Sequence, residues 1–143
     1  MAQIKRASDD EVNGVMEKYP HTRQVMCLGE NTCTLLALDN KEEVVAFLSA
    51  FFREIPAPLH GETECFINVI DVFEAAEQSK GVGSALVQET IAAARERGAL
   101  QVRAYCDIGN AASHRLWLKN GFGISPVKNA DGSVLGSFVT YRV

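Results

Sequence analysis

The sequence predicts an α/β protein in which helices cover both faces of one mixed β-sheet. Apolar runs typical of strands alternate with amphipathic segments of helical period, which favours helices that lie between strands. Two strand-like runs, 32–38 and 44–52, are separated by a short polar turn and predict a hairpin, so the sheet must also contain antiparallel pairs. A length of 143 residues with 47% hydrophobic content suits one domain, which we assign to residues 1–143.

The first half of the chain is expected to supply most of the sheet. Residues 3–7 form a strand-like run, and Ser8 with Glu11 makes a capping box that predicts a helix start. Residues 21–31 show no clear pattern. Residues 65–72 form a nearly continuous apolar run of the kind that is buried on both faces of a sheet. We therefore expect this strand at the centre of the sheet.

The second half of the chain alternates between helical and strand patterns. Leu86, Val87 and Ile91 fall on one helical face, and Gly98 is a stop signal. Asn110 is a candidate N-cap for another helix, which Gly121 closes. The strands expected in this half cover residues 100–106, 122–127 and 134–143.

Composition excludes several classes of function. Fourteen Lys and Arg against eighteen Asp and Glu give a net charge of -4, which is the wrong sign for binding a phosphate backbone, so we expect no nucleic acid partner. No apolar run approaches the ~18 to 20 residues of a membrane span, and the first residues lack an apolar segment behind their charges, so we expect no secretion. We therefore expect a cytoplasmic protein with no membrane partner. The cysteines lack metal-site spacing and are expected to be reduced thiols, mostly buried, with no metal bound: Cys27, Cys33, Cys65 and Cys106.

The segment from Gln78 to Ser84 carries the strongest chemical signal. It reads Gln-Ser-Lys-Gly-Val-Gly-Ser between the central strand and an amphipathic helix. Glycines let backbone N–H groups approach an anion, the helix start favours negative charge, and Lys80 adds a cation. It is not a G-x-G-x-x-G motif, because Leu86 replaces the last glycine, and no Walker loop occurs. Alone, the segment favours the alternative of an ordinary glycine-rich turn that enters a helix.

A second segment changes this interpretation. Gln78-x-x-Gly81-x-Gly83 resembles the pyrophosphate-binding signature Q/R-x-x-G-x-G/A of the GNAT superfamily of coenzyme A-dependent N-acetyltransferases. Residues 110–122, Asn-Ala-Ala-Ser-His-Arg-Leu-Trp-Leu-Lys-Asn-Gly-Phe, resemble that family's downstream segment, N-x-x-A-x-x-F-Y-x-K-x-G-F. The order and spacing of the two segments agree with the family, and so does the series of strands around them. The resemblance therefore covers nearly the whole chain and implies a GNAT-type fold.

The resemblance implies that acetyl-CoA is the co-substrate. Its pyrophosphate would lie on the backbone amides of residues 78–84, and its pantetheine arm would pair with the main chain of Val72 and Phe73 where two parallel strands splay apart. The cofactor-binding residues carried over are Val72, Phe73, Gln78, Ser79, Lys80, Gly81, Val82, Gly83, Ser84, Asn110, Ser113 and Trp117. Asn110 has the alternative role of a helix cap alone, and Lys80 that of a solvated surface charge.

Two positions depart from the family pattern. The segment that follows Val72 lacks the proline of V-x-P, which leaves open the backbone amide that meets the thioester. Trp117 stands where many members have the tyrosine that protonates the departing thiolate. An indole N–H donates a hydrogen bond but does not ionise near neutral pH. The alternative for Trp117 is core packing between helix and sheet.

The catalytic groups must therefore come from a short set of candidates. An amine must lose a proton before it attacks, so a base is the greater need, and Asp71, Tyr105 and Asp107 lie on strands beside the expected splay. Asp71 interrupts an apolar strand; a solvent-facing charge is its alternative role. Tyr105 is expected to replace the missing acid, because its phenol can transfer a proton and the Trp117 indole cannot. The catalytic residues are thus predicted to be Tyr105, Asp71 and Trp117.

The sequence as a whole predicts an N-acetyltransferase that moves an acetyl group from acetyl-CoA to an amine by direct nucleophilic attack. The acceptor is expected to be a small-molecule amine or a peptide amine, and a homodimer is also considered. The alternative is a catalytically silent coenzyme A-binding domain with a regulatory or assembly role. A third interpretation, a nucleotide-binding module of another family, requires the match over residues 110–122 to be coincidental.

Overall fold

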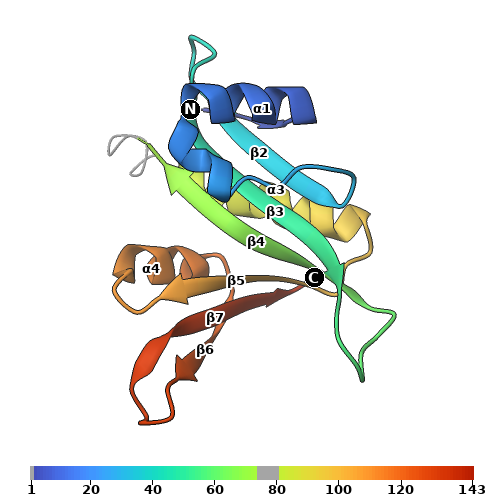
Figure 1. Ribbon diagram of the computed structural model, residues 1–143, viewed down its shortest axis with the longest axis vertical. Helices are drawn as coiled ribbons and strands as arrows, with labels where there is room; N and C mark the ends of the chain where they lie inside the picture. Colours follow the sequence, from blue (N-terminus) through green and yellow to red (C-terminus); the bar gives the residue numbers. More distant parts are fainter. Residues whose placement is uncertain (1, 74–80) are drawn as a thin grey trace.

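The computed structural model describes residues 2–73 and 81–143. It contains one mixed sheet of seven strands in the order β1-β2-β3-β4-β5-β7-β6 (Figure 1). Every pair of neighbouring strands is antiparallel except β4 and β5, which are parallel. The elements are β1 (Gln3–Arg6), α1 (Asp9–Lys18), the 3-10 helix η1 (Pro20–Gln24), β2 (Thr32–Leu38), β3 (Val44–Glu54), β4 (Thr63–Val72), α3 (Val82–Glu96), β5 (Gln101–Asp107), α4 (Ala111–Lys119), β6 (Gly123–Lys128) and β7 (Val134–Arg142).

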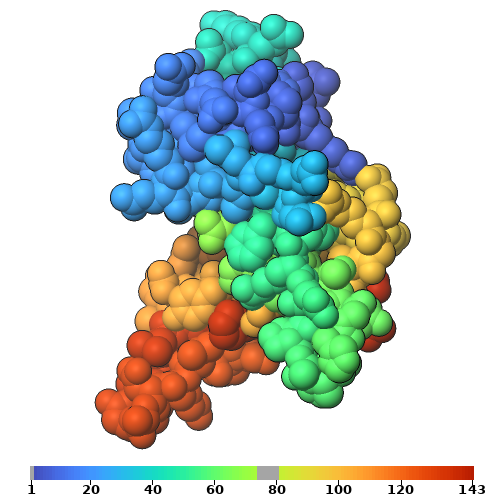
Figure 2. All heavy atoms as spheres, turned by 45° about the vertical axis from the view of Figure 1, so that its right-hand side comes forward, coloured from blue at the N-terminus to red at the C-terminus, as the bar shows by residue number. Residues whose placement is uncertain are grey.

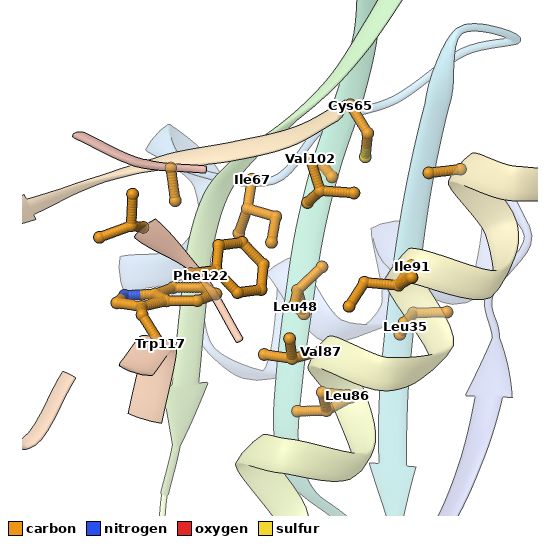
Figure 3. Close-up of a cluster of buried hydrophobic side chains, with 14 of the residues drawn as sticks. Leu35, Leu48, Cys65, Ile67, Leu86, Val87, Ile91, Val102, Trp117 and Phe122 are labelled. Atoms are coloured by element: carbon orange, nitrogen blue, oxygen red, sulfur yellow. The ribbon is translucent and has the colours of Figure 1, made fainter. Parts of the chain in front are cut away.

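Helices cover both faces of this sheet, as the sequence predicted. On the face that we call the first face, α3 and α4 pack on the sheet through one core that includes Leu86, Ile91 and Trp117 (Figure 3). On the opposite, second face, α1 and η1 lie over a smaller cluster that contains Val15 and Phe47. The fold class, a single mixed sheet between two helical layers, is therefore confirmed.

Local signals set the helix ends. The Glu11 N–H donates to Ser8 Oγ at 3.2 Å, and the Ser8 N–H donates to Glu11 Oε1 at 3.1 Å, so the predicted capping box forms. The Ser113 N–H donates to Asn110 Oδ1 at 3.0 Å, which makes Asn110 the N-cap of α4. Gly121 follows that helix with φ of +85°, a conformation that favours glycine. Each of these contacts joins residues that are close in the sequence, which explains why the helix ends could be predicted from the sequence.

The strands differ from expectation where long-range pairing decides. β3 continues past the apolar run to Glu54, because Arg53 pairs with Glu64 across the ladder and their side chains form an ion pair. β4 is the central strand of seven, as predicted, but it is not buried on both faces: Phe66 is half-buried and Asn68 is exposed. The reason is that α1 and η1 cover only part of the second face. In Figure 2 they lie in the upper part of the view, and the β3–β4 and β6–β7 hairpins lie in the lower part.

No helix in the described part of the chain has the length and apolar character needed to cross a bilayer; the longest there, α3, has 15 residues.

Candidate active site

The parallel pair at the centre of the sheet opens toward one end. β4 and β5 are paired only from Glu64 with Gln101 to Ile67 with Ala104. Both strands then continue, β4 to Val72 and β5 to Asp107, without further pairing to each other. Figure 1 shows the two strands diverging, with α4 at the open end. The predicted splay is therefore present.

A β-bulge in β4 lies where the splay begins. In the pairing with β3, Ala50 faces Ile67 and Ser49 faces Val69, so Asn68 is an extra residue. A bulge bends its strand and shifts the alternation of side chains between the faces. As a result Ile67 and Ile70 both contact the first-face core. Sequence reasoning missed this bulge; the one signal was a single polar residue, Asn68, inside an apolar run.

A cleft of about 400 Å³ lies at the open end of the splay. The end of β4, the start of α3 and one side of α4 form its walls. Seven residues singled out from the sequence line it: Asp71, Val72, Gly81, Gly83, Ser84, Asn110 and Ser113. Gln78, Ser79 and Lys80, which were also predicted to bind the cofactor, lie outside the described residues. The structure thus brings the described parts of both motifs to one cleft.

The start of α3 has the properties of an anion site. Gly81 occupies the N-cap with φ of +78°, and no described side chain caps the helix. The first helical hydrogen bond runs from the Ala85 N–H to the Gly81 carbonyl at 3.0 Å, so the amides of residues 82–84 point out of the helix start. The Val82 side chain is buried in the core, and only its main chain is available to a ligand. Backbone amides and the helix dipole favour a phosphate here.

The wall formed by α4 adds two positive charges that sequence reasoning did not single out. Arg115 and Lys119 both line the cleft. They are four residues apart and therefore lie on the same side of the helix. This spacing within the second motif is the signal that could have found them. Both guanidinium and ammonium groups favour an anionic ligand in the cleft.

A polar clamp joins the two helices that form the cleft. Asn120, which is 9% exposed, donates from Nδ2 to Ser84 Oγ at 3.1 Å and accepts at Oδ1 from Gln88 Nε2 at 3.0 Å. The same amide group donates to the Leu116 carbonyl at 2.8 Å. The clamp fixes the end of α4 against the start of α3, and so sets the width of the cleft at that end.

Trp117 lies in the core and does not line the cleft. Its side chain is 2% exposed, and its ring packs on Phe122 with the ring centres 5.0 Å apart (Figure 3). Its Nε1–H donates to Ser113 Oγ at 3.0 Å. The expectation that Trp117 itself contacts the cofactor or the leaving thiolate must be corrected, because the indole N–H is already bonded and faces Ser113. The alternative of core packing fits the structure.

Val72 and Phe73 differ in the direction of their main chains. The Phe73 N–H donates to the Val45 carbonyl at 2.9 Å, which directs it toward β3 and away from the splay. The Phe73 ring packs on Tyr19 and Phe47, on the second face. In an antiparallel pair the direction alternates, so the main-chain groups of Val72 point to the opposite edge, toward the cleft. The cofactor role predicted for both residues therefore fits Val72 and does not fit Phe73.

Asp71 lies at the junction of the cleft with a second cavity. That cavity, of about 520 Å³, is on the second face of the sheet, and Asp71 and Val72 line both spaces. Its other described lining residues are Tyr19, His21, Asp39, Glu43, Val44, Val45 and Phe73. Within the described part of the chain, the Asp71 carboxylate has no hydrogen bond or ion pair.

Tyr105 is on β5 but is not among the described residues that line the cleft. Its neighbours Ala104 and Cys106 face the first-face core, so Tyr105 points to the second face, where it is 41% exposed. Its ring packs edge-on against Phe138, with the ring centres 5.5 Å apart. Asp107, the other candidate base on this strand, is exposed at the end of β5 and also does not line the cleft. The structure does not bring either side chain together with Asp71 in the cleft.

The four cysteines are free thiols. Burial raises the pKa of Cys27 and Cys33, and it raises the pKa of Cys65 to about 12. Cys106 is 3% exposed. The raised pKa makes the thiols of Cys27, Cys33 and Cys65 poor nucleophiles at neutral pH. Over residues 2–73 and 81–143, no cluster of three or more His, Cys, Asp or Glu residues could hold a metal ion.

Comparisons with known proteins agree with this architecture. NAA60 of Arabidopsis thaliana, in structures with acetyl-CoA and with a bisubstrate analogue, has TM-scores of 0.76 and 0.74 at 11% and 13% identity; each match covers 100% of this chain and 99% of that chain. The ribosomal-protein-S18-alanine N-acetyltransferase from Escherichia coli has a TM-score of 0.69 at 18% identity, covering 99% of this chain and 94% of that chain. No curated protein sequence matches the chain significantly. At these identities the likeness shows the fold.

The fold and the cleft define an α/β protein with an anion-binding helix start beside a splayed parallel pair. A sequence profile described as the acetyltransferase (GNAT) family matches residues 4–122. The chain belongs to this acetyltransferase family. The resemblance seen in the sequence motifs is confirmed.

Proposed function

We propose that the protein transfers an acetyl group from acetyl-CoA to an amine nitrogen by direct attack, and that residues 1–143 act as one catalytic domain. The observation that supports this most strongly is the cleft, which joins the uncapped start of α3, the open edge of β4 and the polar side of α4. Acetyl-CoA is the co-substrate. It carries a pyrophosphate, an amide-rich arm and a thioester, and the cleft has a feature suited to each.

The chain's own groups divide the binding between them. The amides of residues 82–84 and the charges of Arg115 and Lys119 suit the pyrophosphate. Val72 and Asn110 line the same cleft, a placement that suits contacts with the pantetheine arm. Gln78, Ser79 and Lys80 are assigned to the pyrophosphate on the motif alone.

Asp71 is proposed as the base. An alkyl ammonium with a pKa of ~10.4 must lose its proton before the nitrogen attacks the thioester carbon. Asp71 accepts that proton directly or through a water, since it lies where the cleft meets the second cavity. The new C–N bond forms as the C–S bond breaks, and the electron pair of that bond goes to sulfur. No covalent enzyme intermediate is required, and the raised thiol pKa values of Cys27, Cys33 and Cys65 do not favour one.

The second cavity is proposed to hold the acceptor. It approaches Asp71 from the second face, whereas the cleft approaches from the side of α3 and α4. Its walls combine Tyr19 and Phe73 rings with the carboxylates of Asp39 and Glu43, a lining that suits an amine of a small molecule or a peptide. Two substrates on opposite sides of the end of β4 would meet at Asp71, as direct transfer demands.

A catalytically silent coenzyme A-binding domain is the second candidate. The observation that favours it is Trp117, because the family's usual acid is replaced by an indole that lies in the core and bonds to Ser113. Both candidates bind the cofactor, and only turnover distinguishes them.

Binding of acetyl-CoA to wild type, Gly83→Glu and Gly83→Ala tests the cleft. Ligand at ~100-fold excess over its Kd stabilises the native state by ~2.7 kcal/mol, so the Tm of wild type should rise by several degrees. The Glu side chain would block the approach to the helix start and repel the pyrophosphate, which should abolish the Tm rise. Gly83→Ala is the matched control, because its Cβ would lie 3.5 Å from the Leu116 side chain, an ordinary contact. No Tm rise in wild type, or an unchanged rise in Gly83→Glu, would refute the proposed site.

A further inference from the structure

Ser113 occupies the position between the buried indole and the cleft. It is in the first turn of α4, one turn before Trp117, and it lines the cleft with Asp71 and Val72. Its main-chain N–H is held by Asn110 Oδ1 at 3.0 Å, and its Oγ accepts the Trp117 indole N–H at 3.0 Å. Two hydrogen bonds, one on the main chain and one on the side chain, therefore fix the hydroxyl group.

The proton count of this hydroxyl decides what it can do. A serine hydroxyl has one proton to donate and two lone pairs, whereas an indole N–H can only donate. Because the indole occupies the lone pair on the core side, the Ser113 O–H is left to donate away from the core. Among the described residues no group accepts that proton. Ser113 also lines the cleft, so a group bound there can accept this proton.

The surrounding charge favours an anion at the same place. Ser113 belongs to the N-terminal turn of α4, a helix of nine residues, where the helix dipole is positive. Arg115 and Lys119 lie further along the same wall. A thiolate near a helix start is stabilised relative to the thiol.

We propose that the Ser113 hydroxyl donates a hydrogen bond to the coenzyme A sulfur as the thiolate departs, and that Trp117 is the positioning residue that orients it. The inference rests on the proposed function. When the C–S bond breaks, its electron pair goes to sulfur, and Ser113 keeps its own proton because a hydroxyl is far too weak an acid to transfer it. The thiolate then takes a proton from solvent, while the proton of the amine leaves through Asp71. Ser113 and Trp117 together thus do part of the work of the family's tyrosine.

The pKa of the coenzyme A thiol bound to the protein tests this assignment without turnover. Coenzyme A is bound to wild type, Ser113→Ala, Ser113→Thr and Trp117→Phe, and the ultraviolet absorbance of the thiolate is followed against pH. A hydrogen bond to a charged group predicts that Ser113→Ala raises the pKa of the bound thiol by ~1 to 2. Ser113→Thr retains a hydroxyl and should keep the wild-type pKa. Trp117→Phe keeps the hydroxyl but not its orientation, so the pKa should rise by less than in Ser113→Ala.

An analogue that lacks sulfur separates this role from packing. Desulfo-coenzyme A should bind wild type and Ser113→Ala with the same Kd, since the lost hydrogen bond involves only sulfur. An equal pKa of the bound thiol in wild type and Ser113→Ala would overturn the inference, and so would weaker binding of desulfo-coenzyme A to the variant by the same factor as coenzyme A. Either result would leave the proposed function standing. Failure of coenzyme A to bind wild type would instead overturn the proposed function, and this inference with it.

Discussion

Glu64 lies where β4 is still paired with β5, before the two strands diverge. Its replacement by Gln should lower the free energy of unfolding measurably. The side chain is 1% exposed on β4. Its carboxylate accepts from Arg53 Nε at 2.7 Å on β3, and from Gln101 Nε2 and Arg103 Nη2, each at 2.8 Å, on β5. One carboxylate therefore ties three neighbouring strands together at the point before β4 and β5 diverge.

The size of the effect follows from the pKa of Glu64. Burial raises this pKa, but hydrogen bonds from Arg103, Gln101 and Arg53 together outweigh burial and lower it from 4.5 to about 2. At 1.36 kcal/mol for each pKa unit, this difference corresponds to about 3 kcal/mol of unfolding free energy. Arg53 keeps 41% of its side chain exposed, so solvent screening reduces the expectation to about 2 to 3 kcal/mol for Glu64→Gln at neutral pH.

The sign of the pH dependence is fixed as well. The folded pKa lies below the unfolded one, so the contribution is fully present above about pH 5 and is lost as the pH falls toward the folded value of about 2. Urea unfolding of wild type and Glu64→Gln should therefore give curves whose separation shrinks between pH 5 and pH 3. Glu62→Gln is the control, because Glu62 is exposed in the loop before β4. Wild-type stability of Glu64→Gln at neutral pH, or a separation that does not change with pH, would refute the reasoning.

Three further substitutions test single contacts. Asp71→Asn should lower kcat by ~100-fold or more with little change in the Kd of acetyl-CoA, as expected for a base; unchanged steady-state kinetics would exclude that role. Tyr105→Phe should keep kcat within ~threefold of wild type, because the phenol lies outside the cleft; a ~100-fold loss would restore Tyr105 as the acid. Gly136→Ala should cost ~1 to 3 kcal/mol in urea unfolding, since its Cβ would overlap the Cys106 carbonyl oxygen and lie 2.6 Å from the Tyr105 hydroxyl; a stable variant would show that β5 and β7 separate easily.

Much of the fold could be predicted because its signals are local. The capping box at Ser8 and the caps at Asn110 and Gly121 act within one helical turn, so they mark helix ends in the sequence itself. Apolar periodicity is also a pattern among neighbouring residues, so the strands could be located from it. The C-terminal end of β3 and the partial exposure of Phe66 could not be predicted, since they depend on which strand or helix lies opposite.

The site was predicted as a set of residues but not as an arrangement. The motifs identified the cleft-lining Gly83 and Asn110, because motif spacing is preserved along the chain. The bulge at Asn68 shifts the alternation along β4 by one residue, and so decides that the N–H of Phe73, and not that of Val72, points to β3. No pattern of spacing reveals such a one-residue shift, because it is created only when β4 pairs with β3.

Turnover is the most direct test of the proposed acetylation of an amine. Purified protein with acetyl-CoA is offered a panel of small-molecule amines, polyamines and peptides with unmodified N-termini, and both free coenzyme A and the acetylated amine are quantified. We predict equal amounts of the two products with at least one acceptor, and loss of both products in Gly83→Glu. Binding of acetyl-CoA by wild type without acetylation of any amine in the panel would contradict the claim and would favour a silent coenzyme A-binding domain.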